Sequence, residues 1–137
     1  MTRIFPIQTE NMAEYWDQVA PFLGLAADRY SKDYDITDVW DALLQKKALL
    51  FGIEVDGVLM GAMTVAPDHQ PKRKMLDIEL VGGKNADKWY YDTIQQLTAF
   101  AKQAGYDALR SNARQGWRKM AKHSGFKETS VTYELEI

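Results

Sequence analysis

The 137-residue chain contains no cysteine, only two histidines and four prolines, and no long uninterrupted apolar run. The lack of cysteine excludes disulfides, thiolate metal sites and a cysteine nucleophile. No apolar stretch approaches the roughly 20 residues that a membrane-spanning helix needs, and the first residues lack the apolar core of a signal peptide. We therefore expect a cytoplasmic protein, and a single domain over residues 1–137, because the length suits one compact domain.

Net charge is also small, at -2, but the charges are unevenly distributed along the sequence. Residues 102–127 contain seven Lys or Arg and one acid, a net charge of +6, and the rest of the chain carries -8. The small total argues against an electrostatic nucleic-acid binder. Arg114, Arg118 and Lys122, spaced by four on one helix face, remain a candidate contact for a nucleic-acid backbone. A solvated helix face is the alternative meaning of that pattern.

The common motifs of catalysis are absent. There is no G-x-x-x-x-G-K-[ST] phosphate loop, no G-x-G-x-x-G, no H-E-x-x-H and no G-x-S-x-G in the sequence. His69 and His123 are far apart, and neither has another ligand at metal spacing. We therefore expect no metal site and ordinary surface positions for both histidines.

Hydrophobic periodicity predicts a layered α/β domain around a mixed sheet. Strands are expected at residues 2–7, 48–55, 58–65, 75–81, 106–111 and 126–137, and helices from about 11, from 35 to 44, from 87 to 104 and from 115 to 124. Asp56 and Gly57 suit a two-residue type I′ hairpin turn. Pro21 should end or kink the first helix, and residues 67–74 have the composition of an exposed loop.

The end of the chain alternates strictly between apolar and polar residues. Val131, Tyr133, Leu135 and Ile137 alternate with Thr132, Glu134 and Glu136. This period of two predicts a final strand with one buried face.

Two carboxylates, Asp77 and Glu79, alternate with apolar residues on the expected strand 75–81. Regular alternation places Leu76, Ile78 and Leu80 on one face and both carboxylates on the other. If that second face is covered, crowding and burial raise one carboxyl pKa and create a general base. The alternative is a half-exposed sheet whose polar face is solvated.

A glycine turn, Gly82-Gly83-Lys84-Asn85, joins this strand to the next helix. Glycines allow the backbone to approach a ligand, and the first N–H groups of a helix favour a phosphate. We also expect Asp87 to cap the helix with its own carboxylate, which would occupy those donors. A plain connecting turn is therefore the alternative.

The order of elements resembles the GNAT-type N-acetyltransferase family, most clearly from residue 48 to the end. The matching features are the Asp56-Gly57 hairpin, the strand 76–81 followed by a glycine turn and a long helix, the segment 107–112, and Gly125-Phe126 after a short helix. The resemblance implies a single-domain, three-layer GNAT-like α/β (α+β) fold, with a mixed, mostly antiparallel sheet flanked by helices. It also implies acyl-CoA-dependent transfer of an acetyl group to an amine by direct attack.

Site residues follow from the same resemblance. Glu79 or Asp77 would be the base that removes a proton from the attacking amine. Acetyl-CoA would be held by Leu80 and Val81 along its pantetheine, by Gly82, Gly83, Lys84 and Asn85 at its pyrophosphate, and by Asn112 near its thiol end. The amine acceptor, a small molecule or a protein, is not identified by the sequence.

Two departures from the family pattern keep alternatives open. The phosphate-loop pattern R/Q-x-x-G-x-G/A is not met by residues 82–87, and Ala121 stands where many members have a Tyr that protonates the departing thiolate. One alternative is an inactive GNAT-like binding or structural protein, of the kind found among phage and mobile-element proteins. A weaker alternative is nucleic-acid binding through the basic helix 114–122.

Overall fold

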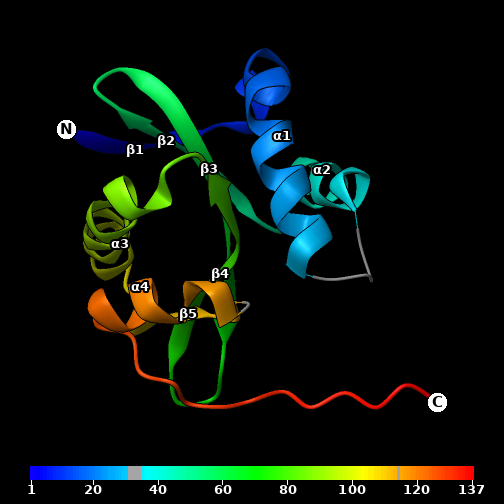
Figure 1. Ribbon diagram of the computed structural model, residues 1–137, viewed down its shortest axis with the longest axis vertical. Helices are drawn as coiled ribbons and strands as arrows, with labels where there is room; N and C mark the ends of the chain where they lie inside the picture. Colours follow the sequence, from blue (N-terminus) through cyan, green and yellow to red (C-terminus); the bar gives the residue numbers. More distant parts are fainter. Residues whose placement is uncertain (31–34, 114) are drawn as a thin grey trace.

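Five strands form one mixed sheet in the order β1-β2-β3-β4-β5 in a computed structural model that describes residues 1–30, 35–113 and 115–137 (Figure 1). The strands are β1 (Thr2–Ile7), β2 (Leu49–Val55), β3 (Val58–His69), β4 (Lys74–Gly83) and β5 (Ala108–Ser111). The helices are α1 (Met12–Tyr30), α2 (Ile36–Leu44), α3 (Ala86–Gln103) and α4 (Arg118–His123), with short 3-10 turns η1 (Thr9–Asn11) and η2 (Gln115–Trp117). Each consecutive pair from β1 to β4 is antiparallel, and only β4 and β5 pair in parallel. The predicted mixed, mostly antiparallel sheet is therefore confirmed.

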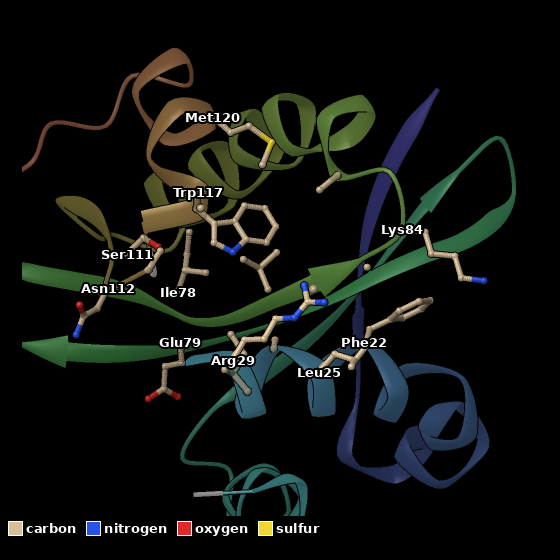
Figure 2. A pocket seen from close by; sticks show the side chains of 18 of the residues that line it. Phe22, Leu25, Arg29, Ile78, Glu79, Lys84, Ser111, Asn112, Trp117 and Met120 are labelled. Carbon is tan, nitrogen blue, oxygen red and sulfur yellow. The ribbon is translucent and has the colours of Figure 1, made fainter. Parts of the chain in front are cut away.

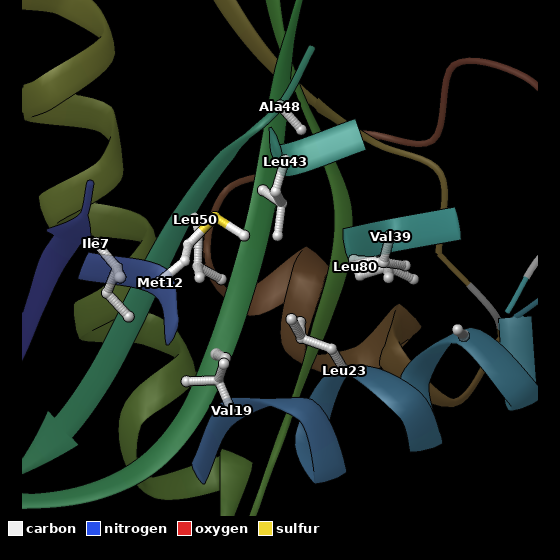
Figure 3. Packing of buried hydrophobic residues seen from close by; sticks show 11 residues of the cluster. Ile7, Met12, Val19, Leu23, Val39, Leu43, Ala48, Leu50 and Leu80 are labelled. Atoms are coloured by element: carbon white, nitrogen blue, oxygen red, sulfur yellow. The ribbon is translucent and has the colours of Figure 1, made fainter. Parts of the chain in front are cut away.

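Two apolar clusters, one on each face of the sheet, make the three layers. The first joins α1 and α2 to the sheet, and Figure 3 shows its packing. Its buried residues are Ile7, Met12, Val19, Leu23, Ala27, Val39, Leu43, Ala48, Leu50, Ala62 and Leu80. The second joins α3 to the opposite face and consists of Phe51, Ile53, Met63, Val65, Leu76, Ile78, Trp89, Tyr90, Ile94, Leu97 and Ala101. Each amphipathic helix thus buries its apolar stripe against the sheet.

The hairpin between β2 and β3 has the predicted turn. Asp56 and Gly57 both have positive φ angles, 51° and 82°, as a type I′ turn requires. The following hairpin is tighter than expected, because β3 continues to His69 and β4 begins at Lys74. Residues 67–69 and Lys74 are therefore strand, and only residues 70–73 form the predicted loop.

Pro21, which was expected to end or kink the first helix, does not end it. α1 continues from Pro21 to Tyr30. Proline removes one helical hydrogen bond, but the residues beyond it bury Leu23 and Ala27 completely against the sheet. Burial of this apolar stripe offsets the lost hydrogen bond.

The predicted C-terminal strand is absent. From Phe126 onward the chain forms neither helix nor strand, and residues 127–137 are exposed. A strand is stable only when its backbone groups pair with a neighbour, and this segment extends away from the sheet of its own chain (Figure 1). The alternating pattern was therefore insufficient to predict a paired strand.

Candidate functional site

The site begins where β4 and β5 separate. The two strands pair in parallel from Met75–Ala108 to Ile78–Ser111. β4 continues to Gly83, whereas β5 ends at Ser111. Beyond Ile78, the edge of β4 that faced β5 has lost its partner, and a fork opens between the strands.

Glu79 is positioned at this fork by a β-bulge. On the opposite edge of β4, Ile78 pairs with Val65 of β3 and Leu80 pairs with the adjacent Thr64, so Glu79 is the extra residue. A bulge of this kind bends the strand and reverses which residues face each side of the sheet. Ile78 accordingly packs in the cluster under α3, and Leu80 packs in the cluster under α1. The predicted common face for Leu76, Ile78 and Leu80 was wrong at Leu80 for this reason.

A cleft of about 330 Å³ occupies the fork, as Figure 2 shows. β4 and the turn after it form one wall, α1 forms the second, and the segment from the end of β5 to α4 forms the third. The lining residues are Pro21, Phe22, Leu25, Ala26, Arg29, Ile78, Glu79, Leu80, Val81, Gly82, Gly83, Lys84, Ala86, Ser111, Asn112, Ala113, Gly116, Trp117 and Met120. Its size and mixture of apolar and polar groups are typical of a small-ligand site.

Most of the residues singled out in the sequence meet in this cleft. Glu79, Leu80, Val81, Gly82, Gly83, Lys84 and Asn112 line it. Asp77 and Asn85 are not among the lining residues. The candidate site is therefore one continuous stretch of β4 and its turn, faced by the end of β5.

The two carboxylates of β4 have different environments. Both oxygens of Asp77 accept hydrogen bonds from Arg110 of β5, at 2.9 Å from Nε and 2.8 Å from Nη2, and Arg110 also pairs with Asp68 of β3. Glu79 has no such partner among the described residues, and partial burial, together with the charge of Asp77, raises the pKa of its carboxyl. Of the two carboxylates, Glu79 is thus the candidate for a general base.

The two glycines predicted to form the turn are instead the last residues of β4, and close packing requires both of them. A Cβ on Gly82 would lie 2.5 Å from the carbonyl oxygen of Phe22, and one on Gly83 would lie 2.3 Å from the carbonyl oxygen of Met60. The first contact brings α1 against β4 and the second brings β3 against the last residue of β4. The glycines therefore shape the cleft wall whether or not a ligand also contacts them.

The turn after β4 places the N-terminus of α3 at the end of the cleft. The Lys84 backbone is held on both sides, since its N–H donates to the Met60 carbonyl at 2.8 Å and its carbonyl accepts from the Trp89 indole at 2.7 Å. Asn85 is the N-cap, in the left-handed conformation, and makes no side-chain capping bond. The expectation that Asp87 caps the helix was wrong, because Asp87 lies within the first turn. The first amides of α3 are thus left without the cap expected from the sequence.

Several lining residues were missed by the sequence analysis. Phe22, Leu25 and Arg29 come from α1, and Trp117 and Met120 come from the segment after β5. Trp117 also packs on the ring of Tyr90, with centroids 5.3 Å apart. No local pattern in the sequence marked these residues, because a cleft wall is built from segments that are distant in the sequence.

Among its described residues, the basic segment 102–127 contributes no charged side chain to the cleft. Its lining residues are uncharged: Ser111, Asn112, Ala113, Gly116, Trp117 and Met120. Arg110 pairs with carboxylates, and Arg118 lies 3.7 Å from Glu128. Lys122 is exposed, and Arg114, the third member of the predicted basic face, lies outside the described residues. The cations that do line the cleft are Arg29 and Lys84.

The described ranges contain neither a metal site nor a membrane-spanning helix. Within residues 1–30, 35–113 and 115–137, no group of three or more His, Asp or Glu residues is arranged to hold a metal ion. In the same ranges, none of the helices combines the length and hydropathy that a membrane span requires.

Sequence comparison finds no relative, since no protein-family model and no curated protein matches the chain. Structural comparison gives many matches. A probable acetyltransferase superposes with a TM-score of 0.75 at 16% identity, covering 98% of this chain and 97% of the other. A ribosomal-protein-alanine N-acetyltransferase from Brucella melitensis biovar Abortus 2308 has a TM-score of 0.74 at 18% identity over 100% of both chains.

An aminoglycoside N-acetyltransferase in complex with CoA is also similar, with a TM-score of 0.69 at 14% identity, covering 100% of this chain and 95% of the other. At such low identities the likeness concerns the fold. In all three comparisons the superposition covers 95% or more of both chains. The chain therefore has the fold of the GNAT-type N-acetyltransferases.

Proposed function

We propose that the chain is an acyl-CoA-dependent N-acyltransferase that transfers an acetyl group to an amine by direct attack. The observation that carries this proposal is the fork between β4 and β5, with Glu79 bulged out at its opening. The fork provides an unpaired strand edge, a carboxylate with a raised pKa and a helix N-terminus along one continuous cleft.

The residues of the cleft fit acetyl-CoA. Among the described residues, the backbone of Glu79–Val81 has no strand partner on the β5 side, and it can hydrogen-bond the amides of a pantetheine arm, much as a neighbouring strand would. Lys84 and the uncapped first turn of α3 suit the pyrophosphate. The cleft volume suits the arm, with the nucleotide lying outside. When bound, acetyl-CoA supplies an activated acyl group as a thioester.

Glu79 takes the role of general base in this proposal. Its carboxylate accepts a proton from the amine, and its raised pKa brings it closer to that of the group it must deprotonate. Asp77 is held by Arg110 outside the cleft lining. Asp77 therefore acts on Glu79 through its charge rather than on the substrate.

The described lining of the cleft contains no tyrosine that could protonate the departing thiolate. Tyr90 packs against Trp117, and burial raises its pKa to about 12. Ser111 and Asn112 offer polar hydrogens at the point where the strands separate. A thiol has a pKa of about 8.5, so its conjugate base is an adequate leaving group without an acid.

Calorimetric titration with acetyl-CoA tests the proposal. We expect saturable binding, weakened about tenfold by Lys84→Glu, since one charge-assisted contact is worth about 1.5 kcal/mol or more. The matched control is Lys102→Glu, the same charge reversal on an exposed lysine in the last turn of α3, which does not line the cleft. The control should bind as the wild type does.

Absence of binding at millimolar acetyl-CoA would reject the acyltransferase. The GNAT-like binding or structural protein would then be the better description of the chain. Equal weakening by both lysine variants would instead place the cofactor outside the cleft.

A further inference from the structure

One charged side chain of the cleft has no part in the acyl transfer proposed above. The charged residues of the described lining are Arg29, Glu79 and Lys84. Glu79 is the proposed base and Lys84 lies at the pyrophosphate end, which leaves Arg29 without a role. Among the described residues, Arg29 pairs with no carboxylate, whereas the guanidinium of Arg110 is shared by two. The guanidinium of Arg29 is therefore available to bind an anion in the cleft.

Helix α1 places Arg29 at the Glu79 end of the cleft. Phe22 lies against Gly82, because a Cβ on that glycine would be 2.5 Å from the Phe22 carbonyl oxygen. Figures 1 and 2 show that α1 runs in the opposite direction to β4, so later residues of α1 lie beside earlier residues of β4. The helix rises about 10 Å from Phe22 to Arg29, and β4 covers about the same length from Glu79 to Gly82. Figure 2 shows the Arg29 side chain reaching from α1 into the cleft.

The cleft also offers an apolar surface close to Arg29. Leu25, one turn earlier on α1, lines the cleft and is 58% exposed. Ile78 and Trp117 line it from the other two walls. Apolar walls with a few charged groups are typical of sites that orient a small ligand. A ligand at this end of the cleft can therefore place an apolar group against Leu25 and an anionic group against Arg29.

From these observations we infer that the amine acceptor carries a carboxylate, which Arg29 binds, and an apolar group, which packs on Leu25. An apolar amino acid is the simplest molecule of this kind. The inference rests on the proposed function, which places the reacting amine at Glu79. The two opposite charges at this end of the cleft then match the ammonium and the carboxylate of one zwitterion. Arg29 is thus a specificity-determining residue for the acceptor.

Binding by Arg29 also orients the amine for transfer. A guanidinium holds a carboxylate through two parallel hydrogen bonds, which fix the direction of the rest of the molecule. In the transfer, the amine nitrogen bonds to the acetyl carbon and the carbon–sulfur bond breaks, with the electron pair leaving on sulfur. Of the two protons that the ammonium loses, Glu79 takes one and the departing thiolate takes the other through solvent. The products are an N-acetyl amino acid and CoA.

Acceptors that differ only at the carboxylate test the inference, with acetyl-CoA as the donor. L-leucine should be acetylated with a kcat/KM about tenfold or more above those of leucinamide and 3-methylbutylamine, which lack the negative charge. The amine of leucinamide is less basic than that of leucine, and the amine of 3-methylbutylamine is more basic. Amine basicity therefore cannot explain a preference for leucine over both.

Replacing the guanidinium should remove this preference. In Arg29→Gln, kcat/KM for leucine should fall to that for leucinamide, and the affinity for acetyl-CoA measured by calorimetry should stay as in the wild type. The matched control, Arg73→Gln, is the same change at an exposed arginine between β3 and β4, outside the cleft lining, and should keep the preference. Arg29 also lies in the last turn of α1, where a cation stabilises the helix end. Loss of that role alone would lower the melting temperature without changing the preference.

Four results would overturn the inference. An equal or lower kcat/KM for leucine in the wild type, or a preference that survives in Arg29→Gln, would do so and leave the acyltransferase standing. Weaker acetyl-CoA binding by Arg29→Gln would place Arg29 on the cofactor. Faster transfer from succinyl-CoA than from acetyl-CoA, lost in Arg29→Gln, would assign the carboxylate to the acyl group. Absence of both acetyl-CoA binding and transfer to any amine would reject the proposed function, and the inference with it.

Discussion

Ile78 and Leu80 lie two residues apart on β4, yet they pack into opposite layers of the fold. Regular strand geometry would place them on the same face, and the bulge at Glu79 between them reverses the order. The pairing of β4 with β5 ends at Ile78, immediately before that bulge. One irregularity therefore both opens the cleft and places a carboxylate at its mouth.

Replacing that carboxylate tests its role as base. We expect Glu79→Gln to lower kcat for acetyl transfer about 100-fold, within the range attributed to general-base catalysis. The affinity for acetyl-CoA measured by calorimetry should stay within about twofold. Glu10→Gln, the same change on the exposed turn η1, is the control and should leave both values unaltered. Unchanged turnover in Glu79→Gln would remove Glu79 from the mechanism.

The stability of the same variant should depend on pH in a defined direction. Burial, followed by the charge of Asp77, raises the Glu79 pKa above its ordinary value of 4.5. The folded chain thus favours the protonated carboxyl, so its contribution to stability is present below pH 4.5 and is lost as pH rises through the folded-state pKa. Glu79→Gln should melt at a higher temperature than the wild type at pH 7 and at the same temperature below pH 4. A lower melting temperature at pH 7 would contradict the raised pKa.

The pair formed by Asp77 and Arg110 should adjust the pKa of Glu79 from a distance. Asp77→Asn removes the negative charge that raises this pKa, and we expect the rising limb of the kcat/KM profile to move to lower pH. Arg110→Gln leaves the charge of Asp77 without its partner, so the limb should move to higher pH. Shifts of the two variants in the same direction would exclude this coupling.

The approach of α1 to β4 depends on Gly82. An added Cβ would meet the Phe22 carbonyl oxygen at 2.5 Å, and a backbone atom cannot move aside as a flexible side chain can. We expect Gly82→Ala to lower the free energy of unfolding by about 2 kcal/mol. Gly24→Ala, in the interior of α1 with no atom within 4 Å of the new Cβ, should instead raise it by about 0.5 kcal/mol or more. Denaturant unfolding of both variants provides the comparison.

Local chemistry made much of the fold predictable. The Asp56-Gly57 turn, strand β1 and the order of helices and strands up to α4 are encoded by short-range patterns, and all of them are present. The continuation of α1 past Pro21 could not be predicted, since burial of Leu23 and Ala27 depends on a sheet formed by distant residues. The missing final strand has a similar cause, because its stability depends on a partner.

Local patterns made the candidate site predictable only along β4 and the turn after it, and Asn112 was expected from the family resemblance alone. The stretch Glu79–Lys84 carries its own signals, a carboxylate and a glycine turn. The bulge that turns Glu79 toward the cleft depends on the pairing of β3 with β4, and Arg29 and Trp117 reach the cleft from segments far away in sequence. Such residues are recruited by tertiary packing, which single-sequence patterns do not encode.

The central claim is that the unpaired edge of β4 holds acetyl-CoA, and amide-resolved NMR of the chain tests it most directly. Titration with acetyl-CoA should shift the backbone amide signals of residues 79–86 and of Ser111 and Asn112, with β1 and residues 129–137 unaffected. Saturation of those shifts together, at one dissociation constant, is the predicted result. No shift at millimolar acetyl-CoA, or shifts confined to residues outside the cleft, would contradict it.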